Sequence, residues 1–139
     1  MKIFFDANVY VSEALVGHGA IRIIEATQRG KWRIYSSKYL LQELERVLVE
    51  DLEFSLRSAL LIHKRVLSRS TLVESESSAE VTEDPKDSPI LQAALSCGAD
   101  YLVSNDQHLL RLDPFEELRI ISMNAYHDLL EDEGLLRLR

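Results

Sequence analysis

A helix followed at once by a short apolar strand restricts the fold of this chain more than any other feature. Residues 84–106 read DPKDSPILQAALSCGADYLVSND, and their apolar side chains recur at helical spacing up to Gly98. Ser88 is a preferred N-cap, the proline after it suits the first helical position, and glycine commonly ends a helix. Residues 101–103 are apolar but too few for a helix, which is typical of a buried strand. A helix and a strand in this order form half of a parallel βαβ unit.

This unit places acids at one edge of the predicted sheet. In a parallel α/β layer, each helix begins at the edge where the strands end. Asp84 and Asp87 precede the helix and Asp106 follows the strand, so all three are expected at that edge. Open α/β sheets bind their ligands at the carboxyl ends of the strands. We therefore expect the functional site there.

The other segments continue the alternation of short apolar runs and amphipathic helices. Residues 6–8 are interpreted as a turn, and the acidic residues 74–83 as a solvated loop. In the helix predicted at 52–68, Leu56, Leu60 and His63 share one face. Strands are predicted at residues 3–5, 32–35, 70–73, 101–103 and 118–121, and helices at 20–30, 36–48, 52–68, 88–97, 109–110 and 123–132.

The resulting order, βαβααβαβ(α)βα, predicts an α/β fold. Its form is a three-layer α/β/α sandwich with a mainly parallel central sheet. The chain of 139 residues is long enough for one sizeable core, and no linker interrupts it. We expect a single domain spanning residues 1–139.

Composition favours a protein of a reducing compartment. The single Cys97 has no partner for an internal disulfide. Asp6 and Glu13 interrupt the apolar run at the N-terminus, which is not typical of a signal peptide. No uncharged stretch approaches the ~18 residues of a membrane span. The sequence therefore predicts a cytoplasmic protein without a membrane segment.

Carboxylates from separate elements are expected to meet at the carboxyl edge of the sheet. Asp6 ends the first strand, and Asp87 and Asp106 flank the helix–strand unit. Glu43 and Glu45 lie on opposite borders of an apolar helix face, so periodicity alone does not decide which of them reaches this edge. Each acid taken singly is more often a cap or a turn residue. Four acids from separate elements favour a shared site.

A shared carboxylate site favours a divalent cation. Neighbouring carboxylates raise one another's pKa unless a positive charge lies between them. The set offers oxygen ligands, and no histidine or cysteine stands at zinc spacing, which favours Mg²⁺ or Mn²⁺. Such ions promote the hydrolysis of phosphodiesters.

Four short motifs in this order resemble those of the PIN-domain ribonucleases, and the similarity covers essentially the whole chain. Residues 3–9 (IFFDANV) are similar to the opening strand and first acid of that family, and residues 37–44 (SKYLLQEL) to its second motif. Residues 84–87 (DPKD) resemble the third motif and residues 104–106 (SND) the fourth. The resemblance is strongest to the single-domain prokaryotic group regarded as toxins of toxin–antitoxin systems.

The resemblance implies a Mg²⁺- or Mn²⁺-dependent endoribonuclease, often a homodimer, that an antitoxin protein holds in check. It selects Glu43 over Glu45. Ala7 and His108 stand where the family commonly has a hydroxyl residue and a further acid, which leaves open whether one or two ions bind. The implied metal ligands and catalytic residues are Asp6, Glu43, Asp87 and Asp106, with Asp84 as an auxiliary acid and with Asn8 and Ser104 supporting the site.

Two other functions stay open. A PIN domain with weak catalysis could bind RNA or protein as a scaffold. A phosphatase or receiver domain would use Asp6 as a phosphoacceptor. However, Asn8 stands where such phosphatases have a second Asp, and the chain lacks the late lysine of receivers.

Charge predicts where an RNA substrate would lie. The net charge is −7, but residues 22–69 carry ten Lys and Arg against six Asp and Glu. This region includes the helix of Glu43, and phosphate binding requires positive charge. The same surface could instead receive an antitoxin or a second subunit. The candidate RNA-binding side chains are Lys38, Arg46, Lys64 and Arg65.

Overall fold

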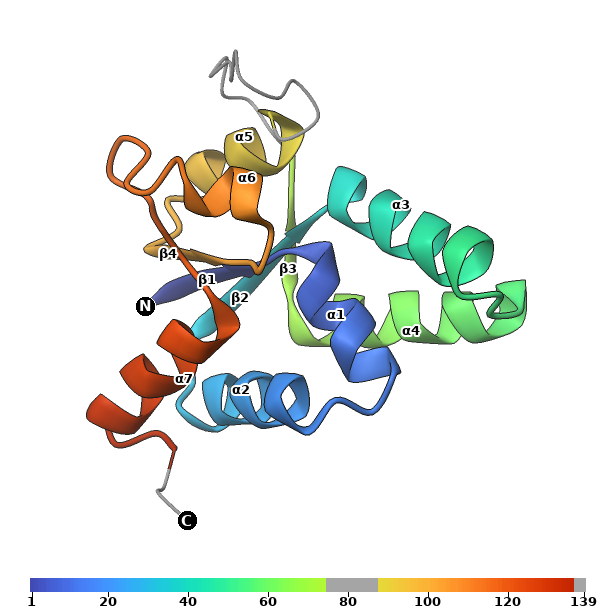
Figure 1. Cartoon of the computed structure of the whole chain (residues 1–139), viewed down its shortest axis with the longest axis horizontal. Coiled ribbons are helices and arrows are strands. Elements are labelled where there is room, and N and C mark those ends of the chain that lie inside the picture. Colours follow the sequence, from blue (N-terminus) through green and yellow to red (C-terminus); the bar gives the residue numbers. More distant parts are fainter. Residues whose placement is uncertain (75–87, 137–139) are drawn as a thin grey trace.

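The computed structural model describes residues 1–74 and 88–136. Its centre is a five-stranded sheet in which every pair of neighbouring strands is parallel (Figure 1). The strands lie in the order β3-β2-β1-β4-β5. They are β1 (Lys2–Phe5), β2 (Arg33–Ser37), β3 (Thr71–Val73), β4 (Tyr101–Val103) and β5 (Arg119–Ile121).

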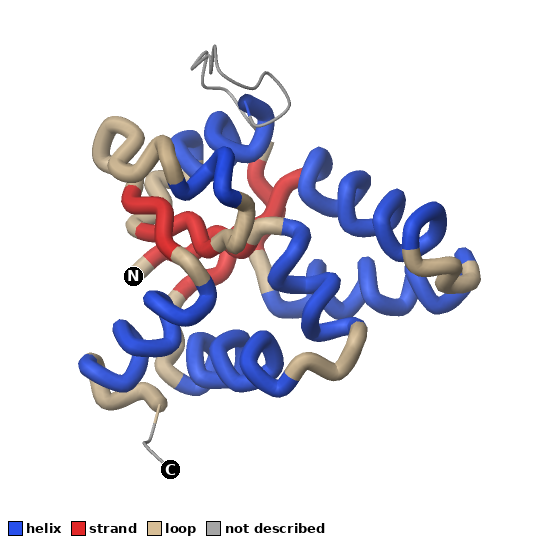
Figure 2. Tube along the Cα trace, viewed as in Figure 1, coloured by secondary structure: helices blue, strands red, loops and turns tan. Residues whose placement is uncertain are grey.

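Helices surround the sheet, as Figure 2 shows. They are α1 (Ala7–Ala14), α2 (His18–Arg29), α3 (Lys38–Arg46), the π-helical turn η1 (Val47–Asp51), α4 (Leu56–Arg69), α5 (Ser88–Ser96), α6 (Gln107–Leu110) and α7 (Met123–Asp132). In Figure 1, α5 and α6 lie on one side of the sheet, and α2 and α7 lie on the other. Helices α3 and α4 extend beyond the sheet on the right of that view.

The path of the chain creates a crevice between β1 and β4. From β1 the chain runs outward through β2 to β3, and it then returns to β4 and runs outward again to β5. Because crossovers between parallel strands are right-handed, the two directions put their helices on opposite faces. The strand order therefore reverses between β1 and β4, and ligands of open α/β sheets bind at such a point.

The core packs aromatic rings between the sheet and the helices. Phe5 at the end of β1 is fully buried. Its ring packs edge-on against the Tyr126 ring of α7, with 5.6 Å between the two ring centroids. The hydroxyl of Tyr126 shares a 2.5 Å hydrogen bond with the Thr27 hydroxyl of α2. This bond satisfies two buried polar groups and ties α7 to α2 beneath the sheet.

The predicted fold class is confirmed, because the sheet is parallel throughout and is covered on both sides. No helix among the described residues is long and apolar enough to cross a bilayer. The predicted turn at residues 6–8 is wrong, since α1 begins at Ala7. The Asp6 carboxylate caps α1 by accepting the Ala7 backbone N–H at 2.8 Å. Aspartate and asparagine are common in turns and in helix caps alike, so the sequence pattern did not separate the two.

The helix predicted at 52–68 begins later than expected. Ser55 is its N-cap, and the Ser55 hydroxyl accepts the Ser58 backbone N–H at 3.0 Å. The face shared by Leu56 and Leu60 points to solvent, with 59% and 44% of those residues exposed. The buried face of α4 is carried instead by small or branched side chains such as Ala59.

Candidate active site

Two of the predicted acids stand at the reversal of strand order. Asp6 follows β1, and Asp106 follows β4 after two residues. These neighbouring strands pair in register from Ile3 with Tyr101 to Phe5 with Val103, so their carboxyl ends lie together. The backbone N–H of Asp6 continues this pairing by donating to the Val103 carbonyl at 3.0 Å. The topology alone therefore brings these two acids to one crevice.

Asp6 is buried and its carboxylate is held on both sides. The residue is 9% exposed. One carboxylate oxygen accepts the Ala7 backbone N–H at 2.8 Å, and the other accepts the Ser104 hydroxyl at 2.7 Å. Burial raises the pKa of Asp6, and repulsion from Asp106 and Glu43 raises it further, while the two hydrogen bonds oppose the shift. A nearby cation would remove this electrostatic conflict.

Ser104 connects the polar groups of the crevice. It is fully buried, and its hydroxyl oxygen accepts the Asn8 side-chain amide at 3.2 Å and the Asp106 backbone N–H at 3.0 Å. Both of these groups are donors, so the only proton of the hydroxyl goes to Asp6. The single donor and the two acceptor positions of Ser104 are thus all used. This fixes the Asp6 carboxylate relative to the loop that carries Asp106.

Asp106 is held by the backbone but keeps one oxygen available. It is the N-cap of α6, where one carboxylate oxygen accepts the His108 backbone N–H at 2.9 Å. No described residue bonds its second carboxylate oxygen. The preceding residue, Asn105, accepts the Met123 backbone N–H at 3.0 Å and so anchors the loop to α7.

Glu43 reaches the same crevice from α3. A cavity of about 660 Å³ is lined by Asp6, Glu43 and Asp106. The structure thus distinguishes the two glutamates of this helix, because Glu45 lines a different hollow. Neither histidine nor cysteine is among the described residues of the wall. Its other lining residues are Ala7, Asn8, Val11, Tyr39, Arg46, Val47, Ile90 and Leu109.

Arg46 also lines the cavity, and it is paired with Glu43. Its Nε and Nη2 donate to the two Glu43 carboxylate oxygens at 3.3 and 3.2 Å. A second, longer contact joins Arg46 to Asp51 at 3.8 Å. The guanidinium therefore supplies positive charge at the rim of an otherwise acidic cavity.

The remaining predicted site residues lie elsewhere. Asp84 and Asp87 fall outside the described residues. Lys38 is exposed at the start of α3 and lines two neighbouring hollows, but not the carboxylate cavity. Lys64 and Arg65 are on α4 and do not line this cavity either, and Arg65 lies 3.7 Å from the Glu13 carboxylate.

Tyr39 is a lining residue that sequence reasoning did not single out. It lies on α3 beside Lys38, and it lines both the carboxylate cavity and an adjoining cavity of about 330 Å³. The aromatic residue inside the second motif was the only sequence signal that could have identified it.

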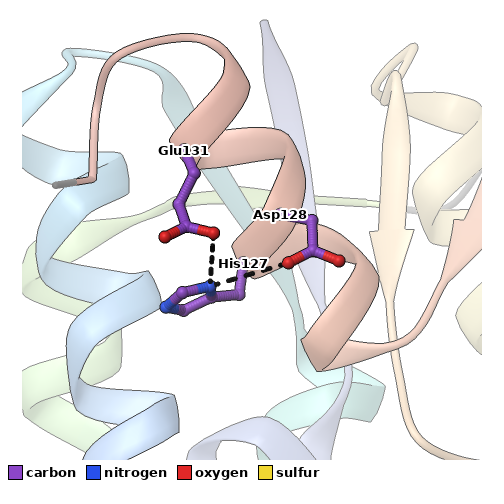
Figure 3. Close-up of side chains that lie close together, drawn as sticks. All are labelled: His127, Asp128 and Glu131. Atoms are coloured by element: carbon purple, nitrogen blue, oxygen red, sulfur yellow. Dashed lines mark ion pairs between the residues drawn. The ribbon is translucent and has the colours of Figure 1, made fainter. Parts of the chain in front are cut away.

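A second group of possible ligands lies on α7, and Figure 3 shows it. His127 Nδ1 is 3.5 Å from a Glu131 carboxylate oxygen and 4.0 Å from one of Asp128. The His127–Glu131 contact is the one expected of side chains one helical turn apart, whereas Asp128 is simply the next residue of the chain. None of the three residues lines the carboxylate cavity. Among the described residues, this is the only such trio whose ligand atoms all lie within 4.8 Å. Asp6, Glu43 and Asp106 do not form such a group among the described residues.

The donor set of the cavity fits a hard divalent ion. Its acids offer oxygen ligands, as Mg²⁺ and Mn²⁺ prefer. Magnesium commonly keeps several waters and takes only one or two carboxylates directly. Asp6, Glu43 and Asp106 are the described residues that would hold such an ion.

These features together are those of an α/β protein that has a group of carboxylates in the crevice between β1 and β4, where the strand order reverses. A family model described as PIN domain matches residues 2–108, and the chain belongs to this family. The match includes all the described acids of the cavity. PIN domains are typically ribonucleases and usually use Mg²⁺ or Mn²⁺. A comparison with curated proteins finds no match to the chain.

Proposed function

We propose that this protein is a Mg²⁺- or Mn²⁺-dependent endoribonuclease that hydrolyses phosphodiester bonds of RNA. The observation that carries the proposal is the buried Asp6 carboxylate, which shares one cavity with Glu43 and Asp106. A buried carboxylate with like charges nearby is unfavourable without a cation. Family membership supports the nuclease chemistry.

The residues of the chain have separate tasks in this proposal. Asp6, Glu43 and Asp106 hold the ion, and Ser104 and Asn8 fix the orientation of Asp6. When bound, the ion supplies positive charge at the phosphodiester and lowers the pKa of water. We also propose Asp87 as a ligand and Asp84 as an auxiliary acid, on the resemblance of residues 84–87 to the third family motif.

Positive and aromatic side chains would position the RNA. Arg46 lines the cavity, and the exposed Lys38 lines the adjoining hollow together with Tyr39. The Tyr39 ring offers a surface on which a base can stack, as aromatic residues do in proteins that bind single strands. A strand could therefore run from the cavity past Tyr39 toward Lys38.

The biological role in this proposal is that of a toxin in a toxin–antitoxin pair. It rests on the resemblance of the four motifs to the single-domain prokaryotic group. We accordingly propose one domain over residues 1–139, a homodimer, an antitoxin partner and a cytoplasmic location.

The proposal is tested by incubating the purified protein with a 5′-labelled single-stranded RNA and, separately, with DNA of the same sequence. RNA cleavage is expected with Mn²⁺ and should stop when EDTA is added in excess. Cleavage that persists in EDTA would contradict the proposed metal requirement. Cleavage of the DNA but not of the RNA would contradict the proposal that RNA is the substrate.

Replacing Ser104 with alanine is expected to lower the rate of RNA cleavage by about 10–100-fold, the usual effect of removing a partner of a metal ligand. Asp6 would lose its side-chain donor, and Asn8 would lose its acceptor. Ser36→Ala is the matched control. Ser36 is also fully buried, but its hydroxyl bonds Ser70, away from the cavity. Both variants should unfold at lower urea concentration, and equal activity of the two would contradict a positioning role for Ser104.

Removing the cation of Arg46 or Lys38 is expected to reduce the salt dependence of RNA binding. Each phosphate contact on a single strand contributes about −0.7 to the slope of log K against log salt. Arg46→Gln and Lys38→Gln should each make this slope less steep by nearly the contribution of one phosphate contact. Binding is measured by fluorescence anisotropy in an Asp6→Asn background, so that the RNA is not cut. Lys64→Gln serves as the control, and a slope changed by Lys64→Gln alone would place the RNA on α4.

A further inference from the structure

Helix α4 exposes a stripe of leucines that no described residue covers. Leu56, Leu60 and Leu67 are 59%, 44% and 37% exposed. Their spacing of four and seven residues places them on one side of the helix together with His63. Leu72, on the edge strand β3, is 50% exposed and lines the same hollow as Leu67. We call Leu56, Leu60, His63, Leu67 and Leu72 the α4 face.

The α4 face is hollowed where α4 approaches α3. A groove of about 280 Å³ is lined on the α4 side by His63 and Leu67 and on the α3 side by Leu41. Contiguous exposed apolar surface beside a hollow is typical of a protein interface. An amphipathic helix commonly binds by laying its apolar side chains into such a groove.

Unpaired positive charges border the α4 face. Arg57 and Lys64 are helical neighbours of Leu60, and Lys38 lines the groove. Among the described residues, none of these three cations has an ion-pair partner. Glu45 is the only acid among the described residues that line the groove. A binding partner with acidic residues beside its apolar ones would match this border.

We propose that the α4 face binds a helical segment of another protein with apolar residues along one side and acidic residues beside them. RNA is the less suitable occupant, because binding of single strands relies on aromatic stacking and the exposed residues of this face are leucines. A second copy of the chain is also less suitable, because pairing α4 with α4 would bring Arg57 and Lys64 against the same cations. The proposal does not rest on nuclease activity, since no residue of the α4 face lines the carboxylate cavity.

The test uses the full chain and a displayed library of helical peptides. Leucine stays fixed at positions i, i+4, i+7 and i+11, and the flanking positions vary freely among Asp, Glu, Lys, Arg and Gln. Peptides are selected on the wild-type protein, and their affinities are then measured by fluorescence anisotropy. The expected result is enrichment of Asp and Glu at the flanking positions, with binding that weakens as salt is raised.

Variants locate the binding site. Leu60→Gln and Lys64→Glu should each weaken binding of the selected peptides by about tenfold. Leu15→Gln removes a leucine elsewhere that is 54% exposed, against 44% for Leu60, and it should leave peptide binding unchanged. Folding of each variant is checked by its thermal unfolding curve.

Four results would overturn the proposal. The first is enrichment of neutral or basic flanks, and the second is peptide affinity that Leu60→Gln leaves unchanged. The third is a dimer, seen by sedimentation equilibrium, that Leu60→Gln dissociates, because a second copy would then occupy the face. The fourth is a loss of RNA affinity in Leu60→Gln. Loss of RNA cleavage in cavity variants bears only on the nuclease proposal, so failures of the two are distinguishable.

Discussion

Replacing Asp6 with asparagine is expected to lower manganese-dependent RNA cleavage by more than about a hundredfold, while the protein stays folded. Removing a mere partner of a metal ligand already costs about 10–100-fold, so loss of the ligand should cost more. The asparagine oxygen can still accept the Ala7 backbone N–H that begins α1. The change also removes a buried negative charge, which offsets the weakened bond to Ser104.

Rates are measured under single-turnover conditions, with a thermal unfolding curve for each variant. The two glutamates of α3 provide a matched pair, because they lie two residues apart and only Glu43 lines the cavity. Glu43→Gln should lose activity as Asp6→Asn does, whereas Glu45→Gln should keep it. Near-normal turnover in Asp6→Asn would remove the proposed mechanism.

Breaking the ion pair between Glu13 and Arg69 is expected to lower the free energy of unfolding by about 3–5 kcal/mol. The two guanidinium Nη atoms donate to the two carboxylate oxygens, each at 2.7 Å. The two side chains are only 7% and 10% exposed, and no described residue accepts a hydrogen bond from the buried Nε of Arg69. Glu13→Leu would leave the guanidinium buried without its hydrogen-bonded carboxylate, next to the fully buried Tyr10.

A double-mutant cycle measures this coupling by urea unfolding. Glu13→Leu and Arg69→Leu should each destabilise strongly, whereas the double variant should recover much of the loss, because no buried charge remains unpaired. Additive losses in the double variant would contradict the coupling. The Arg119–Asp113 pair is more exposed, so Arg119→Leu should change stability far less.

The sequence was sufficient for the architecture because local signals agreed with the tertiary fold. The apolar run at 101–103 is too short to be a helix and is covered on both faces, so it could only be a buried strand. Once the strands are parallel, the residues after them must share an edge. The meeting of Asp6 and Asp106 in one crevice therefore followed from chain order.

Features that depend on packing between distant segments could not be predicted. The Glu13–Arg69 pair joins positions 56 residues apart, and neither residue belongs to a motif. Periodicity placed Glu43 and Glu45 symmetrically, and only the position of α3 beside the crevice separates them. Charge alone grouped Arg46 with Lys64, although Arg46 is paired with Glu43 at the cavity and Lys64 lies on α4.

The central claim is that acids from separate elements together bind Mg²⁺ or Mn²⁺. A Mn²⁺ titration followed by electron paramagnetic resonance tests this claim most directly. The signal of free Mn²⁺ should fall saturably when wild-type protein is present. Asp6→Asn, Glu43→Gln and Asp106→Asn should each weaken this binding, whereas Glu45→Gln should not. Wild-type protein that leaves the Mn²⁺ signal unchanged, or Mn²⁺ affinity equal in wild type and all three cavity variants, would contradict the claim.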